Sequence, residues 1–436
     1  MPKKVIRFLV AILFGNLLIG TSPARAFEIP AVFVFNGSGY GHGVGMSQIG
    51  ARGLALEGKS AAEILYYYYP GTQIAPFPDN QMIRVNISNQ ALNAIISLEK
   101  GIGSFTLYQG DVPINDSPTP FGQYDGTVTA TFTNFSGQII PFLTSTTTSF
   151  PPIPANQSWT IRWDPQSVVE MKSGDKSGRY KYGQMTFKSV TTAVTSYLAV
   201  TTTLRLHDEY IWGIGEVPSS WPPAALEAQA IAARTYALNK LPKSRTECDC
   251  NIYSTTVDQN FVGFSKESEP IYGVRWKEAV NRTFVDADNS LVLTLNGKPI
   301  NAFYFSSSGG KTQNIKEVWG SEFSYLQGVP DPWSLNSSIN PRFSSWNRAI
   351  TQQVMAAAFR LPDVIRYTID ARTTTGSVAK ITGYSVTGAQ RTLTGEVFRG
   401  RVKLPSTWIS ILEEVKIVLP GKLKLQKYQD ELLSKM

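Results

Sequence analysis

The most informative part of the chain is residues 215–240, GEVPSSWPPAALEAQAIAARTYALNK. Proline is favoured in the first turn of a helix, so Pro222 and Pro223 predict that a helix begins here, and Pro242 predicts that it ends near Asn239. The interior of this stretch is rich in alanine, the strongest helix former, whose side chain is also small. We therefore expect a thin helical rod that other backbone segments approach closely.

One carboxylate, that of Glu216, lies just before this predicted helix. Gly215 and Pro218 set a turn around it, and Trp212 and Trp221 flank it in the sequence. A carboxyl group beside indole rings is partly desolvated, which raises its pKa and keeps a proton available for a leaving group. Most glutamates before helices are instead solvated or interact with the helix N-terminus. The pattern alone leaves both interpretations open, a general acid and a surface charge.

Strand and helix signals lie on both sides of this stretch. Asn296-Gly297 is typical of a type I′ hairpin and joins predicted strands at 291–295 and 300–305. Residues 79–185 are rich in Thr, Ser, Asn and Pro and predict short β-strands. A helical stretch is predicted from about Ser47 to Tyr68. We therefore predict an α+β class, a β-rich mixed fold with the alanine-rich helix beside the loop of Glu216.

The composition is that of a globular protein. Of the 436 residues, 42% are hydrophobic and 17% are charged, which is enough to build a core. Half of the formal net charge of +8 comes from Lys3, Lys4, Arg7 and Arg25. The chain has no long basic run interleaved with aromatic residues, so we expect no nucleic-acid partner.

The first 26 residues have the features of an export signal. Basic residues come first, an apolar stretch at 8–19 follows, and Ala24-Arg25-Ala26 is a small-x-small cleavage site. We predict cleavage after Ala26 and a secreted or cell-envelope location; the alternative is an uncleaved membrane anchor. No later stretch is apolar over the length that a bilayer requires, so we expect no transmembrane span after cleavage.

Two cysteines, Cys248 and Cys250, are separated by one residue. In an oxidising compartment they form a local disulfide or remain as free thiols. A zinc site requires about four ligands, and the chain has only two histidines, His42 and His207. We therefore expect no metal site, and no cofactor motif is matched.

Three stretches of the chain resemble the motifs of one known family. Residues 216–238 closely resemble the signature of the sporulation stage II protein D family, which includes the LytB-type amidase enhancers (SpoIID/LytB). FYFSSSGGKT (303–312), with EVWG (317–320) and YLQGVPD (325–331), looks like its second motif. GYGHGVGMSQIGA (39–51), continuing to YYPGT (68–72), resembles its third. Three long motifs are a specific match, which covers about residues 36–75 and 186–410.

The order of these motifs differs from that of the better-known members, in which the GHGVGMSQ stretch comes last. Here it comes first, and TGEVFRG (394–400) looks like part of the segment that usually precedes it. The order resembles a circular permutation, which folds tolerate when the termini lie close together. The predicted parts are a signal peptide (1–26), an N-terminal segment packing on the core (27–78), a β-rich insert (79–185), a SpoIID-like core domain (186–412) and a charged tail (413–436).

The resemblance implies an enzyme that acts on peptidoglycan. Active members of the family are lytic transglycosylases that cut glycan strands lacking stem peptides, and their catalytic glutamate corresponds to Glu216. It would protonate the glycosidic oxygen and then deprotonate the muramic acid 6-hydroxyl, which closes a 1,6-anhydro ring. The alternative is a non-catalytic peptidoglycan-binding protein that stimulates a cell-wall amidase. The expected partners are glycan strands and, for the alternative, such an amidase.

The same resemblance provides candidates for substrate binding. Gln229 and Arg234 of the helix would orient the loop of Glu216 or bind sugar hydroxyls, and structural hydrogen bonds are the alternative. Positions matching a glycan groove would bind acetamido or hydroxyl groups; these are Tyr304, Ser308, Lys311, His42 and Gln48. For Lys311 the alternative is a solvated charge, and for His42 a structural histidine.

Overall fold

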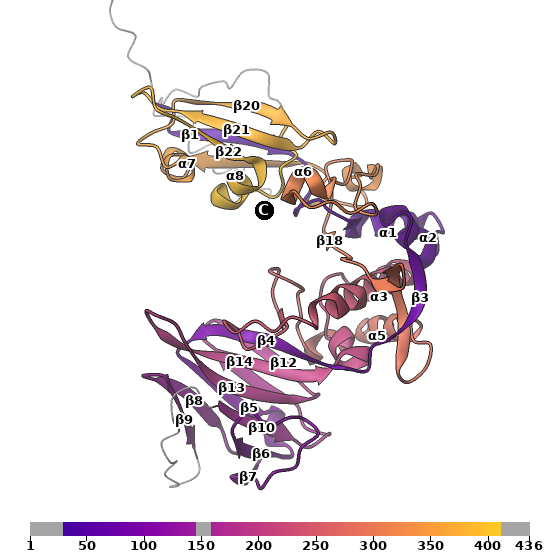
Figure 1. Cartoon of the computed structure of the whole chain (residues 1–436), viewed down its shortest axis with the longest axis vertical. Helices are drawn as coiled ribbons and strands as arrows, with labels where there is room; N and C mark the ends of the chain where they lie inside the picture. The colour runs from indigo at the N-terminus through magenta and orange to yellow at the C-terminus, as the bar shows by residue number, and fades with distance from the viewer. Residues whose placement is uncertain (1–28, 145–157, 411–436) are drawn as a thin grey trace, which may run out of the picture.

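The computed structural model describes residues 29–144 and 158–410, which fold into two lobes joined by a helical layer (Figure 1). The structure is mixed and β-rich, an α+β fold as predicted. The predicted signal peptide and charged tail lie outside the described residues. Within the described ranges, no helix combines the length and the apolar character needed to cross a membrane.

The large lobe contains two packed sheets. The first has the order β15-β4-β14-β13-β10-β6-β7, with β4 (Met82–Ala91), β6 (Ser104–Gln109), β7 (Gly122–Asp125), β10 (Ser158–Trp163), β13 (Gln184–Thr191), β14 (Ser196–Arg205) and β15 (Ile252–Tyr253). The second has the order β12-β11-β5-β8-β9, with β5 (Asn93–Leu98), β8 (Ala130–Phe135), β9 (Gln138–Leu143), β11 (Val169–Ser173) and β12 (Lys176–Tyr180). Phe132 stacks on Phe187 with ring centroids 3.7 Å apart, so the sheets share one core.

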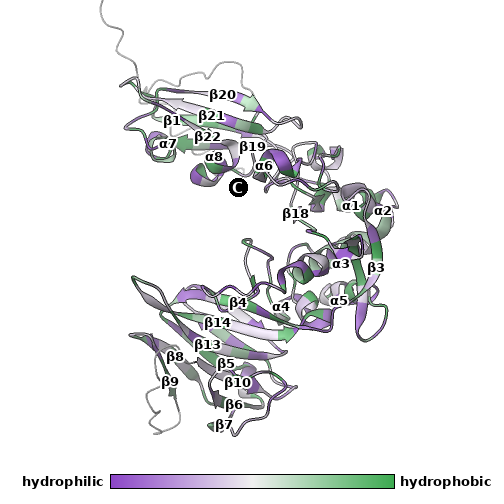
Figure 2. Cartoon of the chain, viewed as in Figure 1, coloured by the Kyte–Doolittle hydropathy of each residue, from purple (hydrophilic) through white to green (hydrophobic). Residues whose placement is uncertain are grey.

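Polar and apolar residues mix along the strands of this lobe (Figure 2). In β5, Ala94, Ile96 and Leu98 are buried, whereas Asn93 and Ile95 are exposed. Successive side chains of a strand point to opposite faces, so one face of this sheet joins the core and the other remains in solvent.

The region predicted as an insert is continuous with the segment that follows it. β4 pairs with β14 from Met82 opposite Arg205 to Ala91 opposite Leu198. The predicted boundary at residue 185 lies inside β13. Residues from both sides of this boundary therefore share one sheet and one hydrophobic core.

Helix α3 spans Pro223–Lys240, close to the predicted start and end. It is buried from Ala225 to Leu238 except at Glu227, because one side packs in the core of the large lobe and another meets α1 (Gln48–Leu56) and α2 (Ala61–Tyr68). The short side chains of the helix allow this packing on several sides.

The single helical stretch predicted between Ser47 and Tyr68 is wrong, because two helices form there. Gly58 adopts φ +85°, a left-handed conformation that a continuing helix does not accept. Ser60 then begins α2 in a capping box with Glu63. Two local signals in the sequence therefore divide the stretch.

The predicted hairpin forms, but its second strand is short. β16 (Asn289–Leu295) and β17 (Lys298–Pro299) pair around Asn296 and Gly297, whose φ values of 52° and 73° suit a type I′ turn. The prediction of one strand over 300–305 is wrong, since only β18 (Tyr304–Phe305) forms and it pairs in parallel with β2 (Met46–Ser47). β3 (Gln73–Pro78) pairs with the other edge of β16.

The small lobe joins the N-terminal strand to the C-terminal part of the chain. β1 (Val32–Gly37) pairs antiparallel with β19 (Trp346–Thr351). A second sheet contains β20 (Arg366–Arg372), β21 (Val378–Tyr384) and β22 (Gln390–Thr394). With α7 (Gln352–Phe359) and α8 (Gly395–Val402), these strands enclose a core that includes Phe35, Phe359 and Phe398.

The two cysteines form a disulfide, Cys248–Cys250. Asp249 between them pairs with Arg84 and, at 2.8 Å, with Lys188, which ties the loop to the seven-stranded sheet. Among the described residues, no group of three or more His, Cys, Asp or Glu side chains is arranged to hold a metal ion.

Candidate active site

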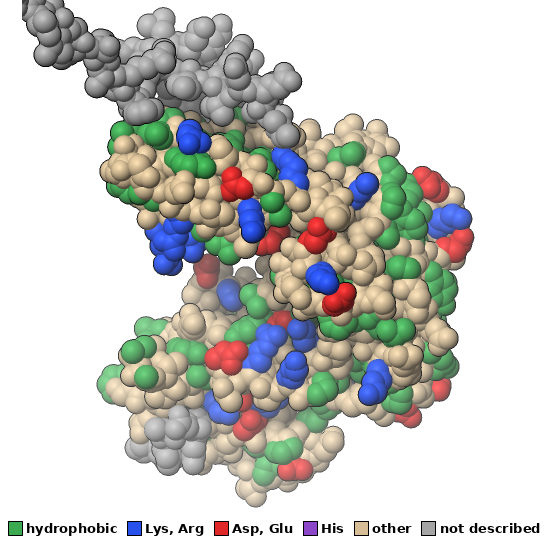
Figure 3. All heavy atoms as spheres, turned by 45° about the horizontal axis from the view of Figure 1, so that its top comes forward, with side chains coloured by type: hydrophobic (Ala, Val, Ile, Leu, Met, Phe, Trp, Pro, Cys, Tyr) green, Lys and Arg blue, Asp and Glu red, His purple; other side chains and the backbone are tan. Residues whose placement is uncertain are grey.

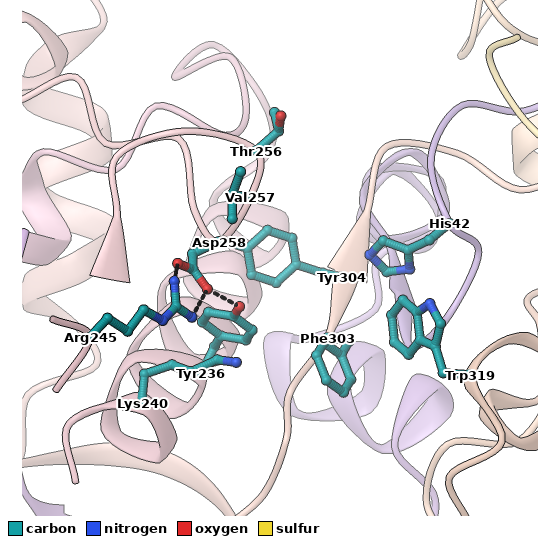
Figure 4. A pocket seen from close by; sticks show the side chains of 10 residues that line it. All are labelled: His42, Tyr236, Lys240, Arg245, Thr256, Val257, Asp258, Phe303, Tyr304 and Trp319. Carbon is teal, nitrogen blue, oxygen red and sulfur yellow. Dashed lines mark hydrogen bonds and ion pairs between the residues drawn. The ribbon is translucent and has the colours of Figure 1, made fainter. Parts of the chain in front are cut away.

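Two neighbouring cavities lie between the lobes, where the space-filling view shows a hollow (Figure 3). The larger has a volume of about 700 Å³ and is lined by Glu216. The smaller has a volume of about 360 Å³ and is lined partly by Phe303 and Trp319 (Figure 4). The residues that line both are His42, Thr256, Asp258 and Tyr304. We call the two cavities together the interlobe groove.

The loop that carries Glu216 is held by a neighbouring segment, residues 260–262. The Gly215 N–H donates to the Asn260 carbonyl at 2.8 Å, and the Asn260 side-chain amide donates back to the Gly215 carbonyl at 2.8 Å. Ile214 forms an isolated β-bridge with Phe261. Lys266 is buried and donates to the Val217 carbonyl at 2.8 Å. The backbone on both sides of Glu216 is therefore fixed.

The Glu216 carboxyl group is partly buried and accepts hydrogen bonds from three sides. The Asn260 N–H donates to Oε1 at 2.6 Å, and the Tyr304 hydroxyl donates to the same atom at 3.3 Å. Burial raises the pKa of Glu216 above its ordinary value, although hydrogen bonds from Asn260, Tyr304 and Gln48 oppose this effect. The raised pKa favours the protonated form of this group, which can release its proton within the groove.

A chain of buried hydrogen bonds sets the direction of the Tyr304 hydroxyl. Gln259 Nε2 donates to the Ala233 carbonyl at 3.2 Å and to the Tyr304 hydroxyl at 2.7 Å, while Gln259 Oε1 accepts from Tyr210 at 2.7 Å. The Ala233 carbonyl can only accept, which fixes the orientation of the Gln259 amide. Since the Tyr304 oxygen accepts from Gln259, its own proton is directed at Glu216.

Two glutamines complete this side of the groove. Gln48, from α1, lines the larger cavity, and its Nε2 donates to Gln229 Oε1 at 3.3 Å. Gln229 lies on α3, is buried, and does not line either cavity. The structure therefore brings Gln48 to Glu216 and places Gln229 behind Gln48 as its support.

His42 lies in the groove as a neutral ring. Its Nδ1 accepts from the Val44 N–H at 3.1 Å, so the ring proton lies on Nε2. Burial, and after it the positive charge of Arg399, lowers the pKa of His42 from 6.5 to about 4. Its ring packs against Trp319 with centroids 4.9 Å apart. These contacts support a structural role for the ring, one edge of which faces the groove.

Besides Gln229, three further predicted binding residues do not line either cavity. Arg234 is fully buried and pairs with Asp79 at 2.8 Å, which is the structural alternative considered for it. Ser308 is buried and donates to Asp331 at 2.6 Å. Lys311 is exposed at the surface. Direct contact of these side chains with a ligand in the groove is thus not supported by the structure.

The two tryptophans that flank Glu216 in the sequence do not line the groove. Trp212 packs against Lys277, whose ammonium lies 3.8 Å from a ring centroid, and Trp221 packs against Arg52. Neither indole lines the cavity that contains Glu216. Burial does raise the pKa of Glu216, and desolvation by the indole rings in particular stays a prediction.

A second polar cluster in the groove was not predicted from the sequence. Asp258 accepts from the Tyr236 hydroxyl at 2.9 Å and from Arg245, as the close view shows (Figure 4). Burial would raise the pKa of Asp258, but the hydrogen bonds, Arg245 first among them, lower it overall. Tyr236 is the only aromatic residue of α3, and this was the available signal. Gln259 and Asn260 gave no local signal.

Comparisons with known proteins point to one family for part of the chain. The model of the SpoIID family, described as Stage II sporulation protein, matches residues 197–286. Stage II sporulation protein D of Bacillus subtilis (strain 168) is 28% identical over 205 residues, 44% of this chain and 55% of its own length. The corresponding protein of Bacillus amyloliquefaciens is 33% identical over 138 residues, 30% of this chain and 40% of its own length.

A third relative has a different name. It is the Amidase enhancer of Bacillus subtilis (strain 168), 35% identical over 129 residues, 28% of this chain and 16% of its own length. The chain thus spans about half or less of the length of these curated relatives. No solved structure matches.

The family match contains one wall of the groove. Residues 197–286 include Glu216, α3 and the pair Gln259–Asn260, whereas Gln48 and Tyr304 lie outside. The family model covers the first of the three sequence motifs, residues 216–238, and three relatives bear the names of the family's two branches. Together they support the assignment of this chain to the stage II sporulation protein D (SpoIID/LytB) family.

Proposed function

We propose that this protein is an exported lytic transglycosylase that cleaves peptidoglycan glycan strands free of stem peptides. The observation that carries the proposal is the environment of Glu216, a partly buried carboxyl group whose pKa is raised and which faces a groove of about 700 Å³. An open groove between lobes suits a polymer, which must enter and leave at both ends.

The proposed reaction uses Glu216 twice. The protonated carboxyl group donates its proton to the glycosidic oxygen, and the C1–O bond of the muramic acid residue breaks. The resulting carboxylate takes the proton from the 6-hydroxyl of the same sugar while that oxygen bonds to C1. Glu216 ends protonated, no water is consumed, and the product has a 1,6-anhydro ring.

Neighbouring groups would adjust Glu216 for both steps. The Asn260 N–H and the Tyr304 hydroxyl stabilise the carboxylate that forms after the first transfer. Burial opposes that charge and keeps the proton available before the transfer. Tyr236, Phe303 and Trp319 line the smaller cavity and offer apolar surface to a sugar ring.

We further propose that the motif order is a circular permutation and that α3 is the active-site helix. The parallel β2–β18 pair supports the first idea, because it places residues 46–47 beside residues 304–305. The His42 carbonyl also accepts from Gln313 at 3.3 Å, so both motif stretches build one wall. Gln229 and Tyr236 of α3 support the second idea through their contacts at the groove.

A second candidate is a non-catalytic enhancer of a cell-wall amidase. The relative named Amidase enhancer favours it. The same groove would then bind glycan without cleaving it, and a partner amidase would perform the hydrolysis.

The test is product analysis with purified protein. Wild-type protein is incubated with strands stripped of stem peptides and, separately, with intact peptidoglycan, and the products are identified by mass spectrometry. We expect 1,6-anhydro-muramic ends from the stripped strands. If no such ends form on either substrate, but the protein binds glycan and accelerates an added amidase, the enhancer function replaces the proposal.

A further inference from the structure

The wall of the groove opposite Glu216 is basic. Arg348 of β19, Arg399 of α8 and Lys403, which directly follows α8, line the same cavity as Glu216. All three belong to the small lobe, outside the residues that match the family model. Basic side chains lie along the edges of the hollow between the lobes (Figure 3).

The basic residues at the C-terminal end of α8 differ in whether they line the cavity. Arg399 in the last turn of α8 and Lys403, the left-handed residue that caps the helix, both line the cavity. Arg401 does not line it and donates to the Ala358 carbonyl at 2.6 Å. Basic residues are generally favourable at the C-terminal end of a helix, because they interact with the negative end of the helix dipole. This effect does not require that Arg399 and Lys403 line the groove.

Much of this positive charge is not neutralised within the protein. Arg399 pairs with Glu396 at 2.8 Å, but Arg348 and Lys403 form no ion pair with any acid that the structure describes. The acidic groups that line the cavity are Glu216 and Asp258, and Asp258 is already paired with Arg245. The charge of Arg399 also reaches the groove, since it helps to lower the pKa of His42.

A neutral sugar does not require such a wall, whereas an anion does. In peptidoglycan, N-acetylglucosamine is uncharged. The lactyl ether of N-acetylmuramic acid ends in a carboxylate when the stem peptide is absent, and in an amide when the peptide is attached. The difference between the two strand types is therefore a negative charge next to the sugar that reacts.

We propose that Arg348, Arg399 and Lys403 form a subsite for the free lactyl carboxylate of N-acetylmuramic acid. The subsite rests on the proposed function and deepens it, because it gives a chemical basis for choosing strands without stem peptides. Arginine and lysine hold carboxylates through charge-assisted hydrogen bonds, and converting the carboxylate to an amide removes that charge. The same contact would fix the direction of the strand, with its charged sugar toward the small lobe.

The test measures binding without turnover, in the Glu216→Gln background. The probes are a muramyl oligosaccharide with free lactyl carboxylates, the same oligosaccharide with those groups converted to methylamides, the peptide-bearing oligosaccharide, and chitotetraose. We expect the free carboxylate form to bind about tenfold or more tightly than the methylamide, as charge-assisted hydrogen bonds imply.

The variant is the double substitution Arg348→Gln/Lys403→Gln, which leaves the Arg399–Glu396 pair in place. We expect the carboxylate preference to fall to about twofold or less, while affinity for chitotetraose stays within about twofold. Arg391→Gln is the control: it removes one charge from the same lobe, and Arg391 is exposed and does not line either cavity. Thermal unfolding of each variant checks that the fold is kept.

The outcomes distinguish failure of the carboxylate subsite from failure of the proposed transglycosylase function. An unchanged preference in the double variant overturns the subsite, as does tighter binding of the peptide-bearing oligosaccharide. If wild-type protein produces anhydro ends but shows no carboxylate preference, the subsite is wrong and the proposed function stands. If the preference is present but no anhydro ends form, the subsite stands and the transglycosylase does not. Failure to bind any glycan overturns both.

Discussion

The Tyr304 hydroxyl donates a hydrogen bond to Glu216 Oε1 at 3.3 Å. It is directed there because Gln259 already donates a hydrogen bond to the Tyr304 oxygen. A carboxylate that receives a fixed hydrogen bond is easier to form than one that relies on mobile solvent. Burial of Glu216 acts in the opposite direction and favours the neutral acid. The proposed double use of one residue depends on the balance between these two effects.

Glu216→Gln is expected to abolish strand cleavage and to preserve the fold. The amide still accepts a hydrogen bond from the Asn260 N–H, but it cannot donate a proton to a leaving oxygen or take one from the 6-hydroxyl. Loss of general acid–base catalysis costs about 10²–10⁴-fold in rate, and two lost steps place the effect at or above the upper end. Anhydro ends counted by mass spectrometry measure it. Glu227→Gln on α3, which loses only an ion pair with Arg282, is the control; equal rates for the two variants would refute the catalytic assignment.

Tyr304→Phe should slow cleavage and also move its pH dependence. The hydrogen bond from Tyr304 lowers the pKa of Glu216, so its removal raises that pKa further. Glu216 must start the reaction protonated, so the alkaline limb of kcat/KM should shift to higher pH. We expect kcat to fall about tenfold, the effect of losing one hydrogen bond to a charged group. Tyr124→Phe, in β7 at the edge of the large lobe, should change neither quantity; an unshifted limb in Tyr304→Phe would argue against the contact.

Arg234→Met should destabilise the protein without altering ligand recognition. It breaks a fully buried pair with Asp79, whose other partner is His207 at 2.7 Å. Breaking one partner of a buried pair typically costs about 3–5 kcal/mol in the free energy of unfolding, and the remaining His207 contact favours the lower end. Adding Asp79→Asn should recover part of the loss. Urea unfolding measures stability, and chitotetraose affinity of the folded variant should equal that of wild type; weaker binding would restore a role for Arg234 in the groove.

Stability should fall between about pH 6.5 and pH 4 partly because of His42. The unfolded chain binds a proton on this histidine below its ordinary pKa of 6.5, whereas the folded protein does so only near 4. A lowered folded-state pKa therefore contributes stability above pH 6.5 that is lost as the pH falls toward 4. The full effect is at most about 3 kcal/mol, and less because the ring is partly exposed. Unfolding of His42→Asn, which keeps an acceptor for the Val44 N–H, should show a smaller loss between pH 7.5 and pH 4.5; an equal loss would contradict the assignment.

Features of the fold with local causes were predictable from the sequence. The two prolines before α3 and the Asn296-Gly297 turn act over a few residues, and both elements formed where expected. The Gly-rich stretch was visible as a motif, but the reason for its glycines is tertiary. A Cβ on Gly45 would lie 1.9 Å from the Phe303 carbonyl oxygen, a contact that exists only after β2 meets β18.

The candidate site also contains residues that local sequence predicts and residues whose position depends on tertiary contacts. Glu216 was predicted from its turn and a motif, and its pKa is raised as expected, but Trp212 and Trp221 pack against Lys277 and Arg52 and do not line its cavity. Gln259 and the basic wall at Arg348 could not be predicted, since their position depends on contacts between segments far apart in the chain. Arg234 matched a motif position, but in the structure it forms a buried ion pair with Asp79 and does not line the groove.

The interlobe groove draws its lining from segments near residues 42, 216, 258, 304, 348 and 400. No fragment shorter than residues 40–405 contains the whole lining of the larger cavity, so chemical competence arises only when both lobes have folded around the same hollow. If the chain leaves the cell unfolded, it travels as an inactive precursor. Activity would then begin at the place where folding finishes.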